Sequence, residues 1–331
     1  MRKIIITLTS VAMIALVACP SAEKNEKTSL NIISKDNAKL YEFNVGKSRY
    51  LMNAQEGALL MKWSVKNDDG SIREVIHWPE GAVRGTIDTV YGGAPIFFPF
   101  SGMSHSGNKP NFWNSSTGEE LPMRKFGFSD NGKYEVVSVS PTEITLKFIE
   151  CEYSKKAYPF KYEFYVNYKF TPTSYKVSMK LKNKDSIAIP WGAGHHPFVA
   201  MPWNKGEKHA DYYIDFDCAS AYYVNNNGGY LIPTNFENKR CDNPQMAARI
   251  HADLQSPIVN IRSKSGKGDL QMIINNGKIE PTFVLVTFGR VDKTPFWAVE
   301  PWMVTPFSAG RHAPKIPAGE DGNFCVELKL K

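Results

Sequence analysis

The sequence predicts an all-β protein that folds as a large antiparallel sandwich. Apolar and polar residues alternate along much of the chain, helical periodicity is scarce, and clusters of Asn, Gly, Asp and Pro interrupt the strand-like runs at short intervals. A period of two is typical of strands with one buried face, because successive side chains point to opposite faces of a sheet. No linker-like composition divides residues 30–331. We therefore predict a single β-sandwich domain over residues 30–331.

The alternation is clearest in residues 162–170, where one face carries only aromatic and apolar side chains. Residues 175–181 repeat the pattern, and the TPTS segment between the two runs has the length of a turn. We therefore predict that the two runs pair as an antiparallel hairpin. Similar apolar runs predict further strands at residues 144–149, 283–288 and 324–330.

Helical signals are few. The sequence Asp242, Asn243, Pro244 predicts the start of a short helix that extends through Ile250, because Pro is favoured in the first helical turn. The NDDG and NNNGG segments that begin at residues 67 and 225 predict turns.

The first 18 residues have the pattern of an export signal. Two basic residues precede an almost wholly apolar run over residues 4–17, which is too short for a membrane span with these flanks. The LVAC sequence that ends at Cys19 resembles a bacterial lipobox, which implies that Cys19 is lipidated and becomes the mature N-terminus. We expect residues 1–18 to be a lipoprotein signal peptide, residues 19–29 to be a flexible tether, and the protein to be lipid-anchored in the cell envelope, facing the periplasm or the outside. The alternative is an ordinary secretory signal with an incidental cysteine.

The formal charge of +7 falls to +5 (7 − 2) once the two basic residues of the signal are removed. The remaining Lys and Arg are dispersed without a long basic block, which argues against a nucleic-acid partner. The four cysteines after Cys19 show no metal-ligand spacing, so we predict no metal site. Export permits a disulfide, for which Cys218 and Cys241 are the best-separated pair. Free buried thiols are an equally open interpretation.

Two short segments far apart in the chain carry residues suited to acid–base chemistry. The segment GHHPF at residues 194–198 offers imidazole beside a proline and an aromatic ring. The segment AVEPW at residues 298–302 offers a carboxylate among apolar residues. A histidine and a glutamate in aromatic walls can act as acid and base near neutral pH, because burial and neighbouring groups tune both pKa values.

Five segments occur in an order and spacing that resemble a known family: residues 57–60 (GALL), 95–99 (PIFFP), 158–160 (YPF), 194–198 (GHHPF), and 300–302 (EPW) followed by 316–320 (IPAGE). Together they resemble the motifs of the aldose 1-epimerase, or galactose mutarotase, superfamily. The resemblance spans nearly the whole chain beyond the N-terminal segment. It implies a large β-supersandwich and an isomerase that interconverts the α and β anomers of a free sugar by opening the ring.

The resemblance implies roles for two residues. His196 would be the general acid toward the ring oxygen and Glu300 the general base toward the anomeric hydroxyl, with the roles reversed after rotation about C1–C2. We expect the two to lie on facing walls of one cleft, on opposite sides of the anomeric carbon, with neither a metal nor an organic cofactor required. The alternative for His196 is a structural histidine that ties a strand end to a backbone carbonyl. A buried Glu300 would be costly unless it is paired or functional.

We also consider three residues as candidates for substrate binding. Trp302 is adjacent to the proposed base and could stack on a sugar face. Arg124 could reach the sugar, although an exposed surface charge is an equal alternative. His195 adjoins the proposed acid, but alternation places it on the opposite face from His196, so a core or surface role is at least as well supported. Four aspartates could bind sugar hydroxyls, and the sequence does not choose among them: Asp211, Asp215, Asp217 and Asp253.

The chain departs from the family pattern in the segment 121–130. Many relatives carry His-Gly-Phe-Ala-Arg there, whereas this chain has Phe126 in place of that His and Asp130 in place of that Arg. We predict a carbohydrate mutarotase with a small-molecule sugar as substrate. The alternative is a non-catalytic carbohydrate-binding lipoprotein with a degenerate site, because a binding module needs donors, acceptors and aromatics but no acid–base pair. A sugar phosphate is disfavoured because export separates the protein from cytoplasmic sugar phosphates and no arginine cluster is evident.

Overall fold

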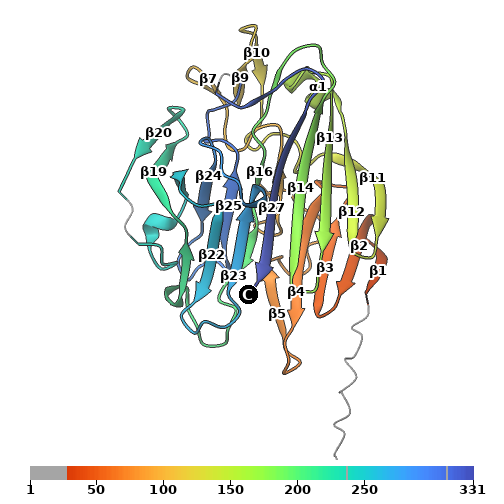
Figure 1. The fold of residues 1–331 in the computed structure, drawn as a ribbon, viewed down its shortest axis with the longest axis vertical. Coiled ribbons are helices and arrows are strands. Elements are labelled where there is room, and N and C mark those ends of the chain that lie inside the picture. The colour runs from red at the N-terminus through yellow and green to blue at the C-terminus, as the bar shows by residue number, and fades with distance from the viewer. Residues whose placement is uncertain (1–27, 236–237, 311) are drawn as a thin grey trace, which may run out of the picture.

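The computed structural model describes residues 28–235, 238–310 and 312–331 of the chain. Almost all of the regular structure is antiparallel sheet, and two large sheets pack against each other (Figure 1). The predicted all-β antiparallel sandwich is therefore confirmed. One large apolar cluster takes side chains from both sheets and forms the core between them.

The larger sheet contains 13 strands. In spatial order they are β1 (Ser29–Lys35), β2 (Ala38–Val45), β3 (Ser48–Asn53), β4 (Leu59–Lys66), β5 (Ile72–Ile76), β17 (Phe198–Ala200), β25 (Phe296–Trp302), β24 (Val284–Phe288), β21 (Arg249–Leu254), β19 (Cys218–Asn225) and β20 (Tyr230–Pro233), with β16 (Gly194–His195) paired to β25 and to β6 (Ile96–Phe97).

The smaller sheet contains eight strands: β11 (Lys133–Ser140), β12 (Glu143–Ile149), β13 (Tyr162–Phe170), β14 (Ser174–Asn183), β27 (Asp321–Leu330), β23 (Leu270–Ile274), β22 (Ile258–Ser263) and β18 (Tyr212–Asp215). Three short pairs complete the strands: β7 (His105–Ser106) with β8 (Lys109–Pro110), β9 (Phe112–Asn114) with β10 (Glu120–Pro122), and β15 (Ile189–Pro190) with β26 (Lys315–Ile316). The described helices are α1 (Glu152–Ala157) and the 3₁₀ turns η1 (His209–Asp211), η2 (Pro244–Met246) and η3 (Asn275–Gly277).

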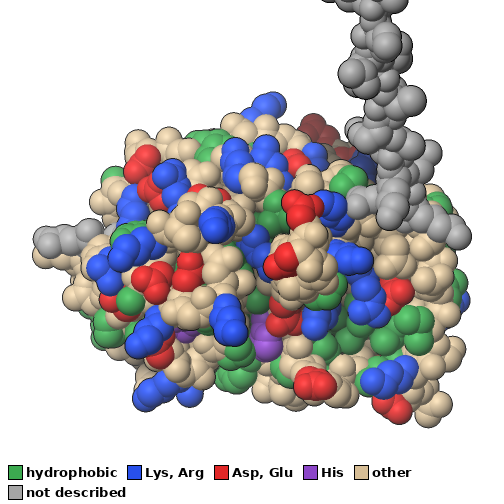
Figure 2. Space-filling view, turned by 90° about the horizontal axis from the view of Figure 1, so that it is seen from below, with side chains coloured by type: hydrophobic (Ala, Val, Ile, Leu, Met, Phe, Trp, Pro, Cys, Tyr) green, Lys and Arg blue, Asp and Glu red, His purple; other side chains and the backbone are tan. Residues whose placement is uncertain are grey.

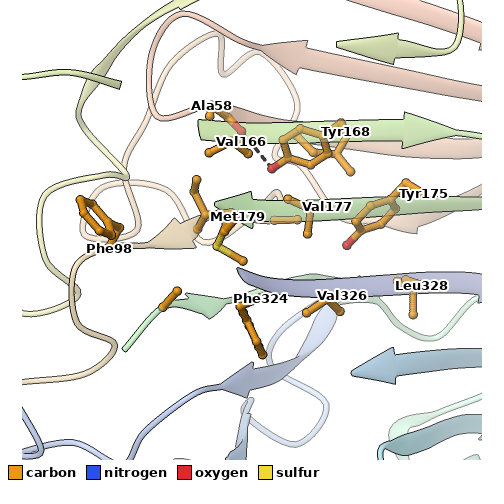
Figure 3. Close-up of a cluster of buried hydrophobic side chains, with 14 of the residues drawn as sticks. Ala58, Phe98, Val166, Tyr168, Tyr175, Val177, Met179, Phe324, Val326 and Leu328 are labelled. Carbon is orange, nitrogen blue, oxygen red and sulfur yellow. Dashed lines mark hydrogen bonds between the residues drawn. The ribbon is translucent and has the colours of Figure 1, made fainter. Parts of the chain in front are cut away.

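The predicted hairpin is confirmed. Strands β13 and β14 pair antiparallel from Tyr162 opposite Asn183 to Phe170 opposite Tyr175. Strand β14 pairs in turn with β27, so the inward side chains of the three strands follow one another on the core face of the sheet (Figure 3). The Tyr168 hydroxyl donates to the carbonyl of Ala58 at 2.9 Å. Each large apolar side chain buried in this way contributes about 1.5–3 kcal/mol. The other predicted strands correspond to β12, β24 and β27.

The helix that we predict from Asp242 to Ile250 is only one turn long. Asn243 caps η2, because its side chain accepts a hydrogen bond from the amide of Gln245. Ile250 instead lies in β21, opposite Tyr222 of β19 and Val286 of β24. Two neighbouring strands supply backbone partners there, and this tertiary pairing overrides the local helix signal.

The four described cysteines are all free thiols, so the disulfide interpretation of Cys218 and Cys241 is wrong. Cys218 begins β19 in the larger sheet, opposite Leu254. The backbone amide of Cys241 instead donates to Tyr212 of β18, in the smaller sheet. The two residues are therefore fixed to different sheets.

The predicted signal peptide and the predicted lipidation site at Cys19 lie outside the described residues. Of the predicted tether, the structure describes only Thr28 and Ser29, and Ser29 is the first residue of β1, opposite Asn44. Among the described residues, no helix combines the length and the apolar character that a membrane crossing requires. On the face shown in Figure 2, basic and acidic side chains are interspersed, in keeping with the dispersed charges of the sequence.

Candidate active site

Strand register brings His196 and Glu300 together across 104 positions of sequence (300 − 196). On one side Gly194 pairs with Trp302, and on the other Phe198 pairs with Ala298. Continuing the same register between these pairs places His196 directly opposite Glu300. Their side chains meet, with Nε2 of His196 3.0 Å from Oε1 of Glu300.

The backbone around His196 is held from both sides. Its amide donates to the carbonyl of Pro95 at 2.9 Å, and the carbonyl of Pro197 accepts from Val299 of β25. Gly194 is required for close packing, because a Cβ atom there would lie 2.8 Å from the Trp302 ring. The segment 194–198 therefore fixes both the position of the imidazole and the approach of the tryptophan.

The histidine–glutamate pair lies in the wall of a cavity of about 370 Å³. The cavity floor is formed by side chains of β24, β25 and β21, which alternate along each strand with side chains that face the core. The apolar side chains on the cavity side form a cluster separate from the main core. Apart from His196 and Glu300, the lining includes six aromatic residues (Tyr91, Phe126, Phe198, Tyr223, Phe288 and Trp302), aliphatic Ile87, Ile250 and Val286, and polar Asp88, Lys125 and Asn226.

The pair is almost completely buried, with 4% of His196 and 2% of Glu300 exposed. The rings of Phe198, Phe97 and Phe126 surround the imidazole, at centroid distances of 4.4, 5.7 and 6.3 Å. A carboxylate in such an apolar wall is costly unless it is paired, and the imidazole of His196 is the partner that lies within ion-pairing distance of it. Among the described residues, Nδ1 of His196 has no hydrogen-bond partner.

The predicted arrangement of the pair differs in one respect from the structure. We expect His196 and Glu300 on facing walls, but they lie side by side in one wall. The reason is that their strand segments are hydrogen-bonded neighbours rather than opposite sides of a cleft. Contact of this kind suits two oxygens bonded to one carbon, as O1 and O5 of an aldose are.

His195 does not line the cavity, so its placement as a substrate-binding residue is wrong. Its ring is fully buried in the core, with Nδ1 3.2 Å from the carbonyl of Pro95 and Nε2 2.9 Å from the hydroxyl of Tyr175. Burial lowers the pKa of His195 to about 3, so the ring is neutral. Because a carbonyl can only accept, Nδ1 carries the proton and Nε2 accepts from Tyr175.

Arg124 also lies outside the cavity lining, and its side chain is exposed. Its guanidinium lies 4.2 Å from the ring centroid of Tyr153, and its amide donates to the hydroxyl of the same tyrosine. Lys125 lines the cavity instead. Both residues lie outside the strands, in the irregular segment and turn that lead to Phe126 with its left-handed φ of +67°, so strand alternation does not apply to them.

The two departures from the family pattern have different environments. Phe126 lines the cavity and stacks on Phe97 with centroids 4.3 Å apart, so an apolar ring occupies the wall beside His196. Asp130 does not line the cavity. Burial raises the pKa of Asp130 to about 6, and the amide of Ile87 donates to its carboxyl group. Trp302 does line the cavity, as we expect for the third substrate-binding candidate.

Sequence reasoning misses several lining residues. Tyr91, Lys125 and Asn226 lie in turns or loops, where side-chain direction has no period that a sequence pattern can reveal. Tyr223 lies in β19, with its ring 3.6 Å from the guanidinium carbon of Arg249. The sequence shows only that Tyr91 and Tyr223 are aromatic, and their exposure is known only from the structure.

Comparison with known proteins identifies the family of this chain. The sequence profile of the aldose 1-epimerase family matches residues 39–224, which include His196. The chain belongs to this family. Protein LacX of Lactococcus lactis, in its plasmid form, is 25% identical over 233 residues, which are 64% of this chain and 73% of LacX.

Solved structures of galactose mutarotase-like proteins share the fold of this chain. A galactose mutarotase-like protein from Lactobacillus casei superposes with a TM-score of 0.69 at 18% identity, over 88% of this chain and 100% of that one. A galactose mutarotase related enzyme from Lactobacillus acidophilus superposes with a TM-score of 0.68 at 18% identity, over 88% of this chain and 97% of that one. The aldose 1-epimerase family and the mutarotase-like sandwich are therefore established for this chain.

Proposed function

We propose that this protein is an isomerase of the aldose 1-epimerase type, which interconverts the α and β anomers of a free aldose. The observation that carries the proposal is the 3.0 Å contact between His196 and Glu300 in the wall of an aromatic cavity. The matching family and fold support a sugar as the small-molecule partner. Aromatic walls with a few polar groups are typical of sites that bind a small molecule, and a pyranose ring has both apolar C–H faces and hydroxyl groups to match them.

The proposed reaction starts from a protonated His196 and an ionised Glu300. The carboxylate removes the proton from O1, the C1–O5 bond breaks with its electron pair going to O5, and the imidazolium gives O5 a proton. The product is the open-chain aldehyde, with a neutral imidazole and a protonated carboxyl group. After rotation about C1–C2, O5 attacks the other face of C1 and both protons return. Each proton transfer of this kind contributes about 10²–10⁴-fold to the rate.

The buried contact between the two groups suits this cycle. The imidazolium–carboxylate pair and the neutral pair contain the same number of protons and the same net charge. Proton movement through the substrate therefore leaves no uncompensated charge in the apolar wall, where one would be costly.

The second candidate is a carbohydrate-binding protein without activity, and Phe126 favours it. The family resemblance implies that many relatives have a histidine at that position, whereas here a phenyl ring lies in the cavity wall. A binding protein keeps the aromatic walls and the polar rim but does not accelerate anomer exchange.

The deciding experiment is anomer exchange followed by NMR across a panel of free hexoses and pentoses, with sugar binding measured in parallel by calorimetry. The proposed function predicts exchange well above the buffer rate for at least one sugar. Binding without exchange would contradict it and establish the binding-protein alternative.

We propose further, from the N-terminal sequence alone, that Cys19 carries a diacylglycerol anchor and that the domain faces the periplasm or the outside of the cell. Mass spectrometry of the membrane fraction should find the lipid on Cys19. An unmodified cysteine in a soluble, secreted form would contradict the anchor.

A further inference from the structure

A second hollow of about 430 Å³ lies beside the cavity. Its lining differs from the aromatic walls of the first, because hydroxyl, imidazole and carboxylate groups make up much of it. The lining residues that matter here are Tyr222, Asp253, Thr282, Thr305, Ser308 and His312.

Strand register shows that the two hollows follow one another on the same face of the larger sheet. In β24, Val286 lines the first and Val284 the second, and in β21 the same holds for Ile250 and Ala252. Residues two apart in a strand point to the same face and are separated by roughly 6.5–7 Å. Beyond β25 the chain continues in the same direction, with Trp302 in the first hollow and Val304 in the second.

The second hollow has the groups that a sugar ring requires. The hydroxyls of Thr305 and Ser308 lie 2.7 Å apart and can each donate to or accept from a ligand hydroxyl. The ring of Tyr222 and the neighbouring Leu231 offer apolar surface for the C–H face of a pyranose. The contacting pair of His196 and Glu300 lies in the first cavity, so ring opening belongs there and recognition to this hollow.

Asp253 is turned into the hollow by its backbone. Regular alternation would place it on the core face with His251, which is buried. Its φ of +52° breaks the alternation, and the side chain is exposed beside Ser220, whose hydroxyl donates to the carboxylate. A left-handed non-glycine residue within a strand is uncommon and concentrates at functional sites.

Asp253 is also the only one of the four candidate aspartates that lines either hollow. The others are engaged elsewhere: Asp215 with Arg262 at 2.8 Å, Asp217 with Lys239 at 3.4 Å, and Asp211 with the amide of Lys208 at 3.0 Å.

We propose that the second hollow binds the next sugar unit of a reducing disaccharide or longer oligosaccharide, whose reducing-end ring occupies the first cavity. The inference rests on the proposed function and names its substrate class. C1 of the reducing-end ring lies at Glu300, and the rest of the chain passes Trp302 toward Thr305 and Ser308. The glycosidic bond is untouched, and only the free anomeric centre changes.

The test compares glucose, maltose and cellobiose as substrates of the full protein, with anomer exchange measured by NMR. In the wild type, kcat/KM for at least one disaccharide should exceed that for glucose by about 10-fold, which corresponds to about 1.4 kcal/mol of added binding to the transition state. Ser308→Trp fills the hollow and should abolish this ratio. Asp253→Asn, which tolerates the left-handed backbone, should reduce it. Ser140→Trp, at an exposed end of β11, is the matched control and should leave it unchanged.

The outcomes separate the inference from the proposed function. Exchange of glucose with no preference for either disaccharide, or the same preference in Ser308→Trp, overturns the second sugar site and leaves the mutarotase proposal standing. If no sugar is exchanged, the mutarotase proposal fails, and calorimetry with maltotriose then decides the site. If maltotriose binds the wild type and binds Ser308→Trp about 10-fold more weakly, the result supports the second sugar site. If maltotriose does not bind the wild type, the second sugar site is overturned.

Discussion

His195 and His196 are neighbours in sequence with opposite environments. The ring of His195 lies in the core between the two sheets, with one nitrogen bonded to Pro95 and the other to Tyr175. The ring of His196 lies in the cavity wall, with one nitrogen on Glu300 and the other without a partner among the described residues. A step of one residue therefore separates an imidazole buried in the core from one in the cavity wall, for which we propose the acid–base role, because a strand turns successive side chains to opposite faces.

The same division runs along β25. Trp297 and Val299 belong to the large core cluster, whereas Ala298 and Trp302 belong to the apolar cluster beneath the cavity, and Glu300 lies between the latter two on the cavity side. One face of the strand stabilises the sandwich and the other presents the site. Substitutions on the two faces should therefore be distinguishable by what they change.

The largest effect is expected at the cavity face. His196→Asn and Glu300→Gln should each lower kcat by about 10²-fold or more, because each removes one partner of the proton exchange. The double variant should lose far less than the product of the two, since the residues act as a unit. NMR anomer exchange measures the rates, and calorimetry checks that sugar affinity changes little. Fully multiplicative losses would show that the two act independently.

The next largest effect is expected at the core face and on stability. His195→Ala should lower the free energy of unfolding by about 2–4 kcal/mol, because it opens a cavity and leaves the Tyr175 hydroxyl and the Pro95 carbonyl unpaired. Urea denaturation measures the loss, and kcat of the folded fraction should stay within a few-fold of the wild type. A loss of kcat as large as that of His196→Asn, without a loss of stability, would refute the division of roles.

A third prediction concerns pH. The folded-state pKa of His195 is about 3, below the unfolded value of about 6.5. Below about pH 6.5, the unfolded chain therefore binds a proton at this histidine that the folded protein does not. The contribution of the neutral ring to the unfolding free energy is fully present above about pH 6.5 and is lost as the pH falls toward 3, by about 1.4 kcal/mol per pH unit. His195→Gln should reduce the number of protons taken up on unfolding by about one between pH 6 and 4, and so flatten the pH dependence of the unfolding free energy in that range. Coincident slopes would contradict the buried neutral ring.

The smallest effect is expected at Arg124. Because its guanidinium packs on Tyr153 at the surface, Arg124→Ala should change the unfolding free energy by no more than about 1 kcal/mol and leave kcat/KM unchanged. Lys125 is the next residue and does line the cavity, so Lys125→Ala should raise KM. Steady-state rates for the two variants, with thermal unfolding as the stability check, measure the contrast. A higher KM in Arg124→Ala together with an unchanged KM in Lys125→Ala would show that Arg124 binds the substrate.

The sequence determined most of the fold by itself. The hairpin of β13 and β14 was predictable residue by residue, because every second side chain is apolar and the sheet period is two. The same period correctly separated His195 from His196, although the sequence also allowed His195 in the site. The motif order identified the family, and the chemistry of a buried glutamate among aromatic residues pointed to Glu300.

Only the tertiary structure decided what depends on contacts between distant segments. Pairing of the 194–198 segment with β25 placed His196 against Glu300 in one wall rather than across a cleft. A positive φ at Asp253 broke the alternation on which sequence reasoning depends and turned this residue into the second hollow. The turn before Phe126 placed Lys125 rather than Arg124 in the cavity lining. Local patterns encode which face a strand residue takes. They do not encode which strand lies opposite or where a turn reverses the period, because those depend on the packing of the whole sandwich.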